Sequence, residues 1–196
     1  MLYILSKLQK KIGFKLTPVC IDEGITGYRE KLLSHLSRLT DRLDLDLKVV
    51  SFENEFNFRL DEVIEKAERK GYKPCTVCGV LRRYLINKVA LDLKADKLSV
   101  GHNLDDEIQT FLMNITHGHI GNIIRRGLVT DLVKYENFVT RIKSLFFNED
   151  KEDSIYALIM GFYPPVVECP YARFSARYAY RNFINDVETK WGNVKI

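Results

Sequence analysis

The fold class follows from the stretch Lys97-Leu98-Ser99-Val100-Gly101-His102-Asn103-Leu104-Asp105-Asp106-Glu107, near the middle of the chain. Its first four residues are typical of a short central strand, which ends at Gly101. The acidic residues that follow are typical of the first turn of a helix, because carboxylates complement the positive end of the helix dipole. A strand that leads through a glycine into a helix indicates a sheet with helical connections.

The same alternation of strands and helices extends toward both ends of the chain. Apolar periodicity predicts helices around residues 2–12, 32–43, 60–67, 81–93 and 172–190, and apolar runs predict strands at 14–21, 45–52, 128–133 and 138–145. Residues 117–127 are punctuated by glycine and predicted to be irregular. Because strands separated by helices need parallel crossovers, we expect an α/β fold with a doubly wound, mostly parallel sheet.

Composition indicates one ordinary globular domain. The chain has 196 residues, of which 46% are hydrophobic, enough to bury one sizeable core. Its apolar runs fall far short of the roughly 18 residues that cross a bilayer, so we expect no membrane span. Four cysteines, two of them in a CxxC, are typical of cytosolic metal or redox chemistry, so we expect a cytoplasmic location. The net charge of +4 permits a polyanionic partner without requiring one.

Three of the four cysteines carry the strongest chemical signal. Cys75 and Cys78 form a CxxC, Cys169 stands in Glu168-Cys169-Pro170, and Cys20 falls in a predicted strand, where we assign it to the core. A CxxC serves zinc, disulfide exchange or a cluster, and zinc usually takes a fourth Cys or His ligand. Three cysteines without an evident fourth suit an iron–sulfur cluster with one open iron. A zinc or redox pair, with Cys169 as an ordinary buried thiol, stays the alternative.

The acidic loops suggest a second site. Ligands of open parallel sheets lie at the carboxyl ends of strands, so we expect Asp22 and the Gly101-His102-Asn103 loop on one rim, around a phosphate-bearing ligand. Capping alone would account for Asp105. Adjacent carboxylates at Asp105, Asp106 and Glu107 exceed what capping needs, and carboxylate oxygens are ligands that Mg²⁺ prefers.

Four motifs, in this order along the chain, resemble one enzyme family. They are Asp22-Glu23-Gly24-Ile25-Thr26-Gly27-Tyr28-Arg29, Cys75-Thr76-Val77-Cys78-Gly79, Gly101-His102-Asn103-Leu104-Asp105-Asp106-Glu107 and Glu168-Cys169-Pro170-Tyr171. Together they resemble the PP-loop tRNA thiolation enzymes of the TtcA/TtuA group, in particular the archaeal and thermophile 2-thiouridine branch. The likeness covers essentially the whole chain and implies a PP-loop ATP pyrophosphatase fold, which is HUP-like and Rossmann-like.

The resemblance implies a two-step reaction at a tRNA base. ATP adenylates the C2 oxygen of a uridine, and a sulfur atom then displaces AMP. Cys75, Cys78 and Cys169 would hold a [4Fe-4S] cluster, Asp106 would be the catalytic or Mg²⁺-associated acid, and Arg82 would steady developing negative charge. The residues expected to border the nucleotide are Gly101, His102, Asn103, Asp105 and Asp22.

The implied partner is tRNA, and the basic residues near the C-terminus offer a surface for it. Arg173, Arg177 and Arg181 recur every four residues, which predicts one helix face, with Tyr171 nearby for stacking on bases. A solvated helix face accounts for the stripe equally well. The resemblance leaves open a ubiquitin-like sulfur carrier or sulfide as the sulfur donor, and a homodimer as the assembly.

The chain departs from the family most clearly at the phosphate-binding loop. A PP-loop reads Ser-Gly-Gly-x-Asp-Ser, and no two glycines are adjacent in this sequence. We therefore expect residues 1–196 to be one catalytic domain truncated at both ends, without the first strand, the phosphate loop or the zinc-finger modules, and to bind Mg-ATP weakly. A non-catalytic remnant that binds tRNA or a partner subunit is the corresponding alternative function.

Overall fold

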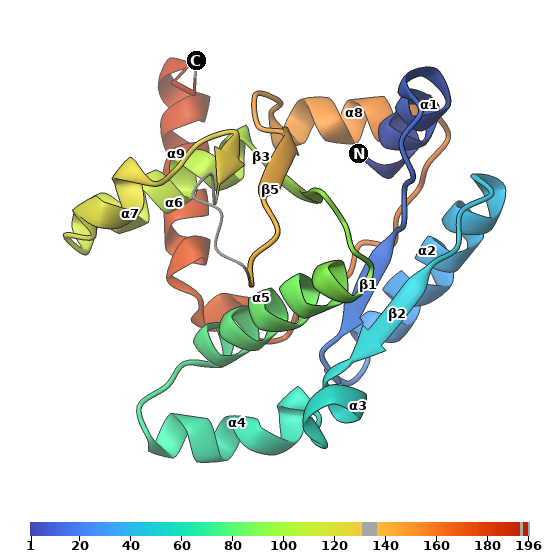
Figure 1. Ribbon diagram of the computed structural model, residues 1–196. Coiled ribbons are helices and arrows are strands. Elements are labelled where there is room, and N and C mark those ends of the chain that lie inside the picture. The colour runs from blue at the N-terminus through green and yellow to red at the C-terminus, as the bar shows by residue number, and fades with distance from the viewer. Residues whose placement is uncertain (131–136, 193, 196) are drawn as a thin grey trace. The chain divides into compact units, whose positions relative to one another are not determined.

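The computed structural model describes residues 1–130, 137–192 and 194–195 (Figure 1). These residues fall into two compact units. The first unit comprises Met1–Lys88 and Pro164–Ala172, and the second comprises Val89–Tyr163 and Arg173–Ile196. No helix in the described ranges combines the length and the apolar character that crossing a membrane requires.

The first unit contains a parallel pair of strands with helices between and after them. Its elements are α1 (Leu2–Ile12), β1 (Val19–Asp22), α2 (Arg29–Arg42), β2 (Lys48–Ser51), α3 (Phe52–Phe56), α4 (Leu60–Arg69) and the first part of α5 (Pro74–Asp92). Strands β1 and β2 run side by side in Figure 1, with Val19 opposite Lys48 and Asp22 opposite Ser51. The connection through α2 is the helical crossover that parallel pairing requires.

The core of the first unit explains why its elements begin and end where they do. Phe52, Leu60 and Leu85 are almost completely buried, and Cys20 is buried in β1, which confirms its assignment to the core. Gly13 ends α1 in a left-handed conformation with φ 84°. At the other strand, the Ser51 hydroxyl accepts a hydrogen bond from the Asn54 N–H and caps α3.

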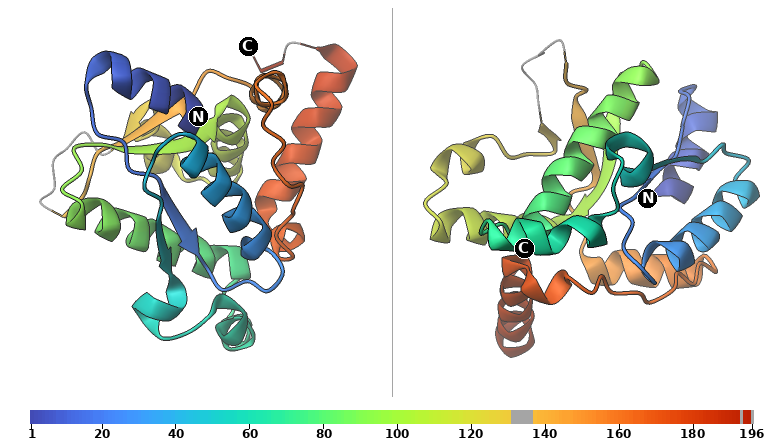
Figure 2. Two further views of the ribbon diagram at one scale, coloured as in Figure 1. Left: turned by 90° about the vertical axis from the view of Figure 1, so that its right-hand side faces the viewer. Right: turned by 90° about the horizontal axis from the view of Figure 1, so that it is seen from below.

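The second unit contains a three-stranded sheet. Its elements are the end of α5, then β3 (Leu98–Asn103), α6 (Leu104–Thr116), α7 (Ile120–Ile124), β4 (Val129–Thr130), β5 (Arg141–Leu145), α8 (Asp150–Ile159), the short 3₁₀ turn η1 (Ala172–Phe174) and α9 (Ala176–Trp191). The strand order is β3-β5-β4, with β3 parallel to β5 and β4 antiparallel to it. Helices α6 and α9 pack against each other, and both can be followed in Figure 2.

The predicted α/β class with parallel strands is confirmed. Several predicted boundaries are wrong. β1 begins only at Val19, because Pro18 has no N–H to donate to a ladder, and β2 ends at Ser51, because that residue caps a helix. β3 is an outer strand of the described three-stranded sheet rather than a central one.

The C-terminal part also differs from the prediction. The helix expected from residue 172 starts at Ala176, since Ser175 caps it and η1 precedes it. The sequence pattern does not predict α8, and part of the strand expected at 128–133 lies outside the described residues. The expectation of one truncated domain over residues 1–196, and that of a shared rim for Asp22 and the Gly101-His102-Asn103 loop, stay predictions.

Candidate functional site

The first unit brings the three predicted metal ligands into one neighbourhood. Cys75 and Cys78 lie one turn apart in the first turns of α5, and Cys169 lies in the returning segment Pro164–Ala172. All three are free thiols and partly exposed. Burial is the main cause that raises the pKa of Cys78. The Cys75 and Cys169 thiols are close enough to raise that pKa further.

Tyr171 connects two of these cysteines through its backbone. The Cys75 thiol donates to the Tyr171 carbonyl oxygen at 3.5 Å. Burial raises the pKa of the Cys169 thiol, and a hydrogen bond from the Tyr171 N–H to its sulfur partly opposes that rise. Burial likewise raises the pKa of Cys78 to about 11, against the opposing charge of Arg82.

Arg82 is positioned by an ion-pair cluster at the end of β1. The Glu23 carboxylate is 1% exposed and forms an ion pair with Arg29 at 2.6 Å. Arg82, whose side chain is 51% exposed, approaches the same carboxylate at 3.6 Å. One buried carboxylate therefore holds two guanidinium groups, one of which lies near the Cys78 sulfur. Glu23 and Arg29 belong to a family motif, but the sequence alone assigns neither of them a role.

Asp22 makes a local loop contact. Its Oδ1 accepts a hydrogen bond from the Gly24 N–H at 2.9 Å, the Asx-turn contact that favours Asp at such positions. The predicted nucleotide role of Asp22 stays a prediction.

These residues are compatible with a soft metal centre. Three free thiols from α5 and the Cys169 segment form the donor set that iron–sulfur clusters use. Within residues 1–130, 137–192 and 194–195, no three His, Cys, Asp or Glu side chains are already arranged at metal-binding distances. The three thiols are the right kind of ligand for a cluster, and they lie near one another.

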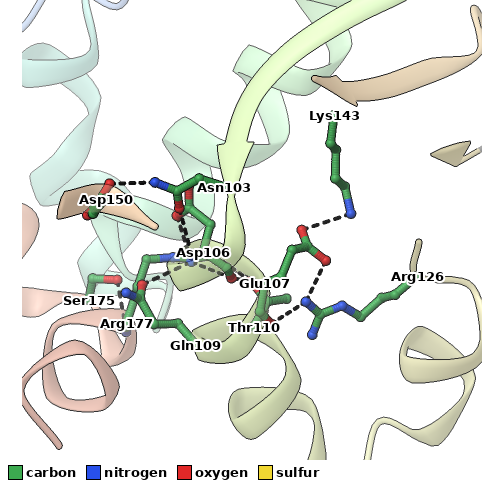
Figure 3. A network of polar contacts seen from close by, with 10 residues as sticks. All are labelled: Asn103, Asp106, Glu107, Gln109, Thr110, Arg126, Lys143, Asp150, Ser175 and Arg177. Atoms are coloured by element: carbon green, nitrogen blue, oxygen red, sulfur yellow. Dashed lines mark hydrogen bonds and ion pairs between the residues drawn. The ribbon is translucent and has the colours of Figure 1, made fainter. Parts of the chain in front are cut away.

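The second unit holds the Asp106 group, whose polar contacts are drawn in Figure 3. The Asn103 side chain caps α6 by accepting from the Asp106 N–H at 3.1 Å, and it donates to Asp150 at 2.5 Å. Asp106 Oδ1 pairs with Arg177 Nη1 at 3.1 Å, and the same guanidinium donates to Gln109 and Thr110. The α6 N-terminus is thus tied to α9 through Arg177.

Asp105 is occupied by internal partners. Its side chain is 6% exposed; one oxygen pairs with Lys195 at 2.7 Å, and the other accepts from the Asp150 N–H at 2.8 Å. That N–H is the first of α8, so Asp105 caps a neighbouring helix rather than its own. Gly101 and His102, by contrast, are exposed at the end of β3. The nucleotide roles predicted for these residues and for Asn103 stay predictions.

Glu107 sits beside a pocket in the same unit. It forms ion pairs with Arg126 at 2.7 Å and Lys143 at 2.8 Å, and all three side chains are largely buried. The pocket has a volume of about 280 Å³ and a mostly apolar lining of Glu107, Ile108, Phe111, Ile123, Arg126, Gly127 and Phe146. The ion-pair partners come from separate elements, which is why no local sequence pattern predicts the cluster.

The three predicted RNA-facing arginines do not share one helix face. Arg173 lies in η1 and stacks on Phe174, Arg177 pairs with Asp106, and Arg181 stacks on Tyr178. The prediction of a continuous stripe is wrong because η1 and the Ser175 cap interrupt the helix between Arg173 and Arg177. Tyr171 is engaged by Asp61 through its hydroxyl at 2.8 Å. An RNA-binding role for the three arginines stays a prediction.

Known proteins resemble this chain over nearly all of its length. No protein-family model matches it. A "Probable sulfurtransferase" of Methanocaldococcus jannaschii is 39% identical over an alignment of 201 positions, which covers all of this chain and 58% of that protein. The "tRNA 2-thiolation protein NcsA" of Haloferax volcanii is 35% identical, over 90% of this chain and 55% of that protein.

A solved structure agrees with these relatives. The U34-tRNA thiolase NcsA from Methanococcus maripaludis, with its [4Fe-4S] cluster, matches with a TM-score of 0.85 and 29% identity, over 100% of this chain and 63% of that chain. The chain thus spans about half the length of the curated relatives it matches. Across nearly its whole length, it is homologous to the tRNA 2-thiolation proteins.

Proposed function

We propose that this chain takes part in ATP-dependent 2-thiolation of a uridine in tRNA, with Cys75, Cys78 and Cys169 as the ligands of a [4Fe-4S] cluster. The observation that supports the proposal is that three free thiols lie in one neighbourhood of the first unit, two of them in contact with the backbone of Tyr171. The cluster in the matching archaeal thiolase supports it. ATP, Mg²⁺, tRNA and a cytoplasmic location are parts of the same proposal.

The reaction consists of two substitutions. In the first, the uridine C2 oxygen attacks the α-phosphorus of ATP, an O–P bond forms and pyrophosphate leaves. In the second, a sulfur nucleophile forms the C2–S bond while the C2–O bond breaks and AMP leaves. When bound, the cluster supplies an iron without a protein ligand, a soft site for sulfur.

In this proposal, the side chains of the protein stabilise charge and keep the reacting groups in place. Arg82 is more than half exposed while it is anchored by Glu23, so its guanidinium is available to stabilise negative charge that develops near the cysteines. Asp106, held by Arg177, supplies a fixed carboxylate at the N-terminus of α6 for Mg²⁺ or a proton. Asn103, which caps the same helix, keeps that end in place.

Anaerobic reconstitution with iron and sulfide tests the ligand set. We expect the unmodified chain to take up iron and acid-labile sulfide with the charge-transfer absorption of a cluster. Serine replacements of Cys75, Cys78 or Cys169 should each lower the iron content severalfold, because each removes a thiolate ligand. Cys20→Ala is the matched control, since that thiol is buried in β1, and it should load normally. Formation of thiolated uridine in tRNA, with ATP and sulfide supplied, reports the reaction itself.

Other outcomes would support the two alternatives. A colourless chain that purifies with zinc and takes up no iron would indicate a zinc or redox domain. The chain could load a cluster and bind tRNA but form no thiolated uridine, even when it is extended with the parts of its relatives that it does not cover. That outcome would indicate a binding role.

A further inference from the structure

The Cys169 segment has little regular structure to hold it in place. Residues 162–169 form neither helix nor strand, whereas Cys75 and Cys78 are fixed by α5. The position of the third thiol therefore depends on a few tertiary contacts. The long-range hydrogen bonds that the structure shows for this segment are made by Tyr171, two residues after Cys169.

Tyr171 makes three polar contacts, each to a different partner. Its carbonyl oxygen accepts from the Cys75 thiol at 3.5 Å, and its N–H donates to the Cys169 sulfur. Its hydroxyl donates to Asp61 Oδ1 at 2.8 Å, across 110 residues of sequence. The side chain thus anchors a backbone that touches two of the three thiols.

Asp61 is well placed to act as that anchor. It lies in the first turn of α4, where the helix dipole favours a carboxylate. Its second oxygen, Oδ2, accepts from the Thr26 N–H at 2.9 Å, in the loop that follows β1. Both oxygens therefore hold loops, and the hydrogen bond to Tyr171 has an ionised acceptor, which makes it stronger than a neutral one.

We propose that Asp61 and Tyr171 are positioning residues that hold Cys169 opposite the Cys75–Cys78 turn. The purpose of this arrangement, which is to hold a cluster, rests on the proposed function. The arrangement itself can be tested in the metal-free chain. Neither side chain is a metal ligand: they act on the cysteines through the backbone of Tyr171.

The first test measures how readily two thiols are bridged by dibromobimane, a short bifunctional reagent. In a Cys20→Ala, Cys78→Ser background, the rate of Cys75–Cys169 bridging reports the position of the Cys169 segment. Tyr171→Phe and Asp61→Ala should each slow it by at least about tenfold, the scale expected for losing one hydrogen bond to a charged acceptor. The double variant should be little slower than Asp61→Ala alone, because Asp61→Ala already removes the hydrogen bond that Tyr171→Phe removes.

Two controls separate positioning from general loosening. Bridging of Cys75 to Cys78, measured in a Cys20→Ala, Cys169→Ser background, should not respond to Tyr171→Phe. Tyr72→Phe, at an exposed tyrosine of the same unit, should change neither rate. An unchanged Cys75–Cys169 rate in Tyr171→Phe, or equal slowing of both thiol pairs, would overturn the proposal.

The second test uses the reconstituted chain. Loss of iron to a chelator should be severalfold faster in Tyr171→Phe than in the unmodified chain or Tyr72→Phe. Iron loss at the unmodified rate counts against the proposal. If the unmodified chain takes up no cluster, the proposed function fails while the bridging rates still decide whether Asp61 and Tyr171 position Cys169.

Discussion

At the scale of single residues, the largely buried Glu107 carboxylate is the counter-charge of two largely buried cations. Burial acts to raise the pKa of Glu107, but its ion pairs with Lys143 and Arg126 outweigh burial and hold that pKa below its usual 4.5. Glu107→Gln would leave two largely buried cations without a counter-charge. We expect it to lower the free energy of unfolding by about 3 kcal/mol, measured by urea denaturation. Glu65→Gln, at a pair that is mostly exposed, should change it by less than about 0.5 kcal/mol.

The same ion pairs predict a pH dependence. The folded state binds a proton at Glu107 less readily than the unfolded state, so the stabilisation is fully present above the unfolded pKa and is lost as the pH falls through the folded pKa. The difference in unfolding free energy between the unmodified chain and Glu107→Gln should therefore shrink as the pH is lowered below about 4.5. A difference that stays constant down to acid pH would show that the carboxylate charge is not what stabilises this cluster.

At the scale of elements, the turn after β1 is closely constrained at Gly24. Gly24 has φ 71°, and a Cβ atom there would lie 2.7 Å from the Arg59 Cβ and 3.0 Å from its Cα. Gly24→Ala therefore combines left-handed strain with a clash against backbone that cannot move aside. We expect a loss of about 2–3 kcal/mol in thermal or urea unfolding.

Gly13→Ala is the matched control for that change. Gly13 also has a positive φ, of 84°, but a Cβ atom there would meet nothing within 4 Å, so only the conformational strain of about 1 kcal/mol applies. Equal losses at the two glycines would contradict the close approach of Arg59 to the loop.

The elements differ in how well the sequence predicts them. The end of α1 at Gly13 is predictable because a glycine follows a regular apolar period. α8 is not, because its apolar residues do not mark a buried face: Ile155, Leu158 and Ile159 are all exposed. The predicted strand limits are too wide because an apolar run does not show where a ladder stops, as at Pro18 and Ser51.

At the scale of the whole molecule, the motifs identify the site residues but not their partners. Cys75, Cys78 and Cys169 can be named from their sequence contexts. Asp61 cannot, because its link to Tyr171 spans 110 residues and an aspartate in the first turn of a helix is typical of an ordinary helix start. Contacts between residues far apart in the sequence are set by the fold, which local patterns do not specify.

Cluster binding should stabilise the two units unequally. All three thiols belong to the first unit, where a cluster would tie α5 to the Pro164–Ala172 segment. A ligand that binds only the folded state stabilises the structure that holds it, and local opening of the tied segments becomes rarer. In hydrogen-exchange measurements on the loaded and metal-free chains, we expect slower exchange around Cys75 to Cys78 and in residues 164–172. Exchange in β5, in the second unit, serves as the internal reference, and equal slowing there would show that the cluster stabilises the chain as one cooperative body rather than locally.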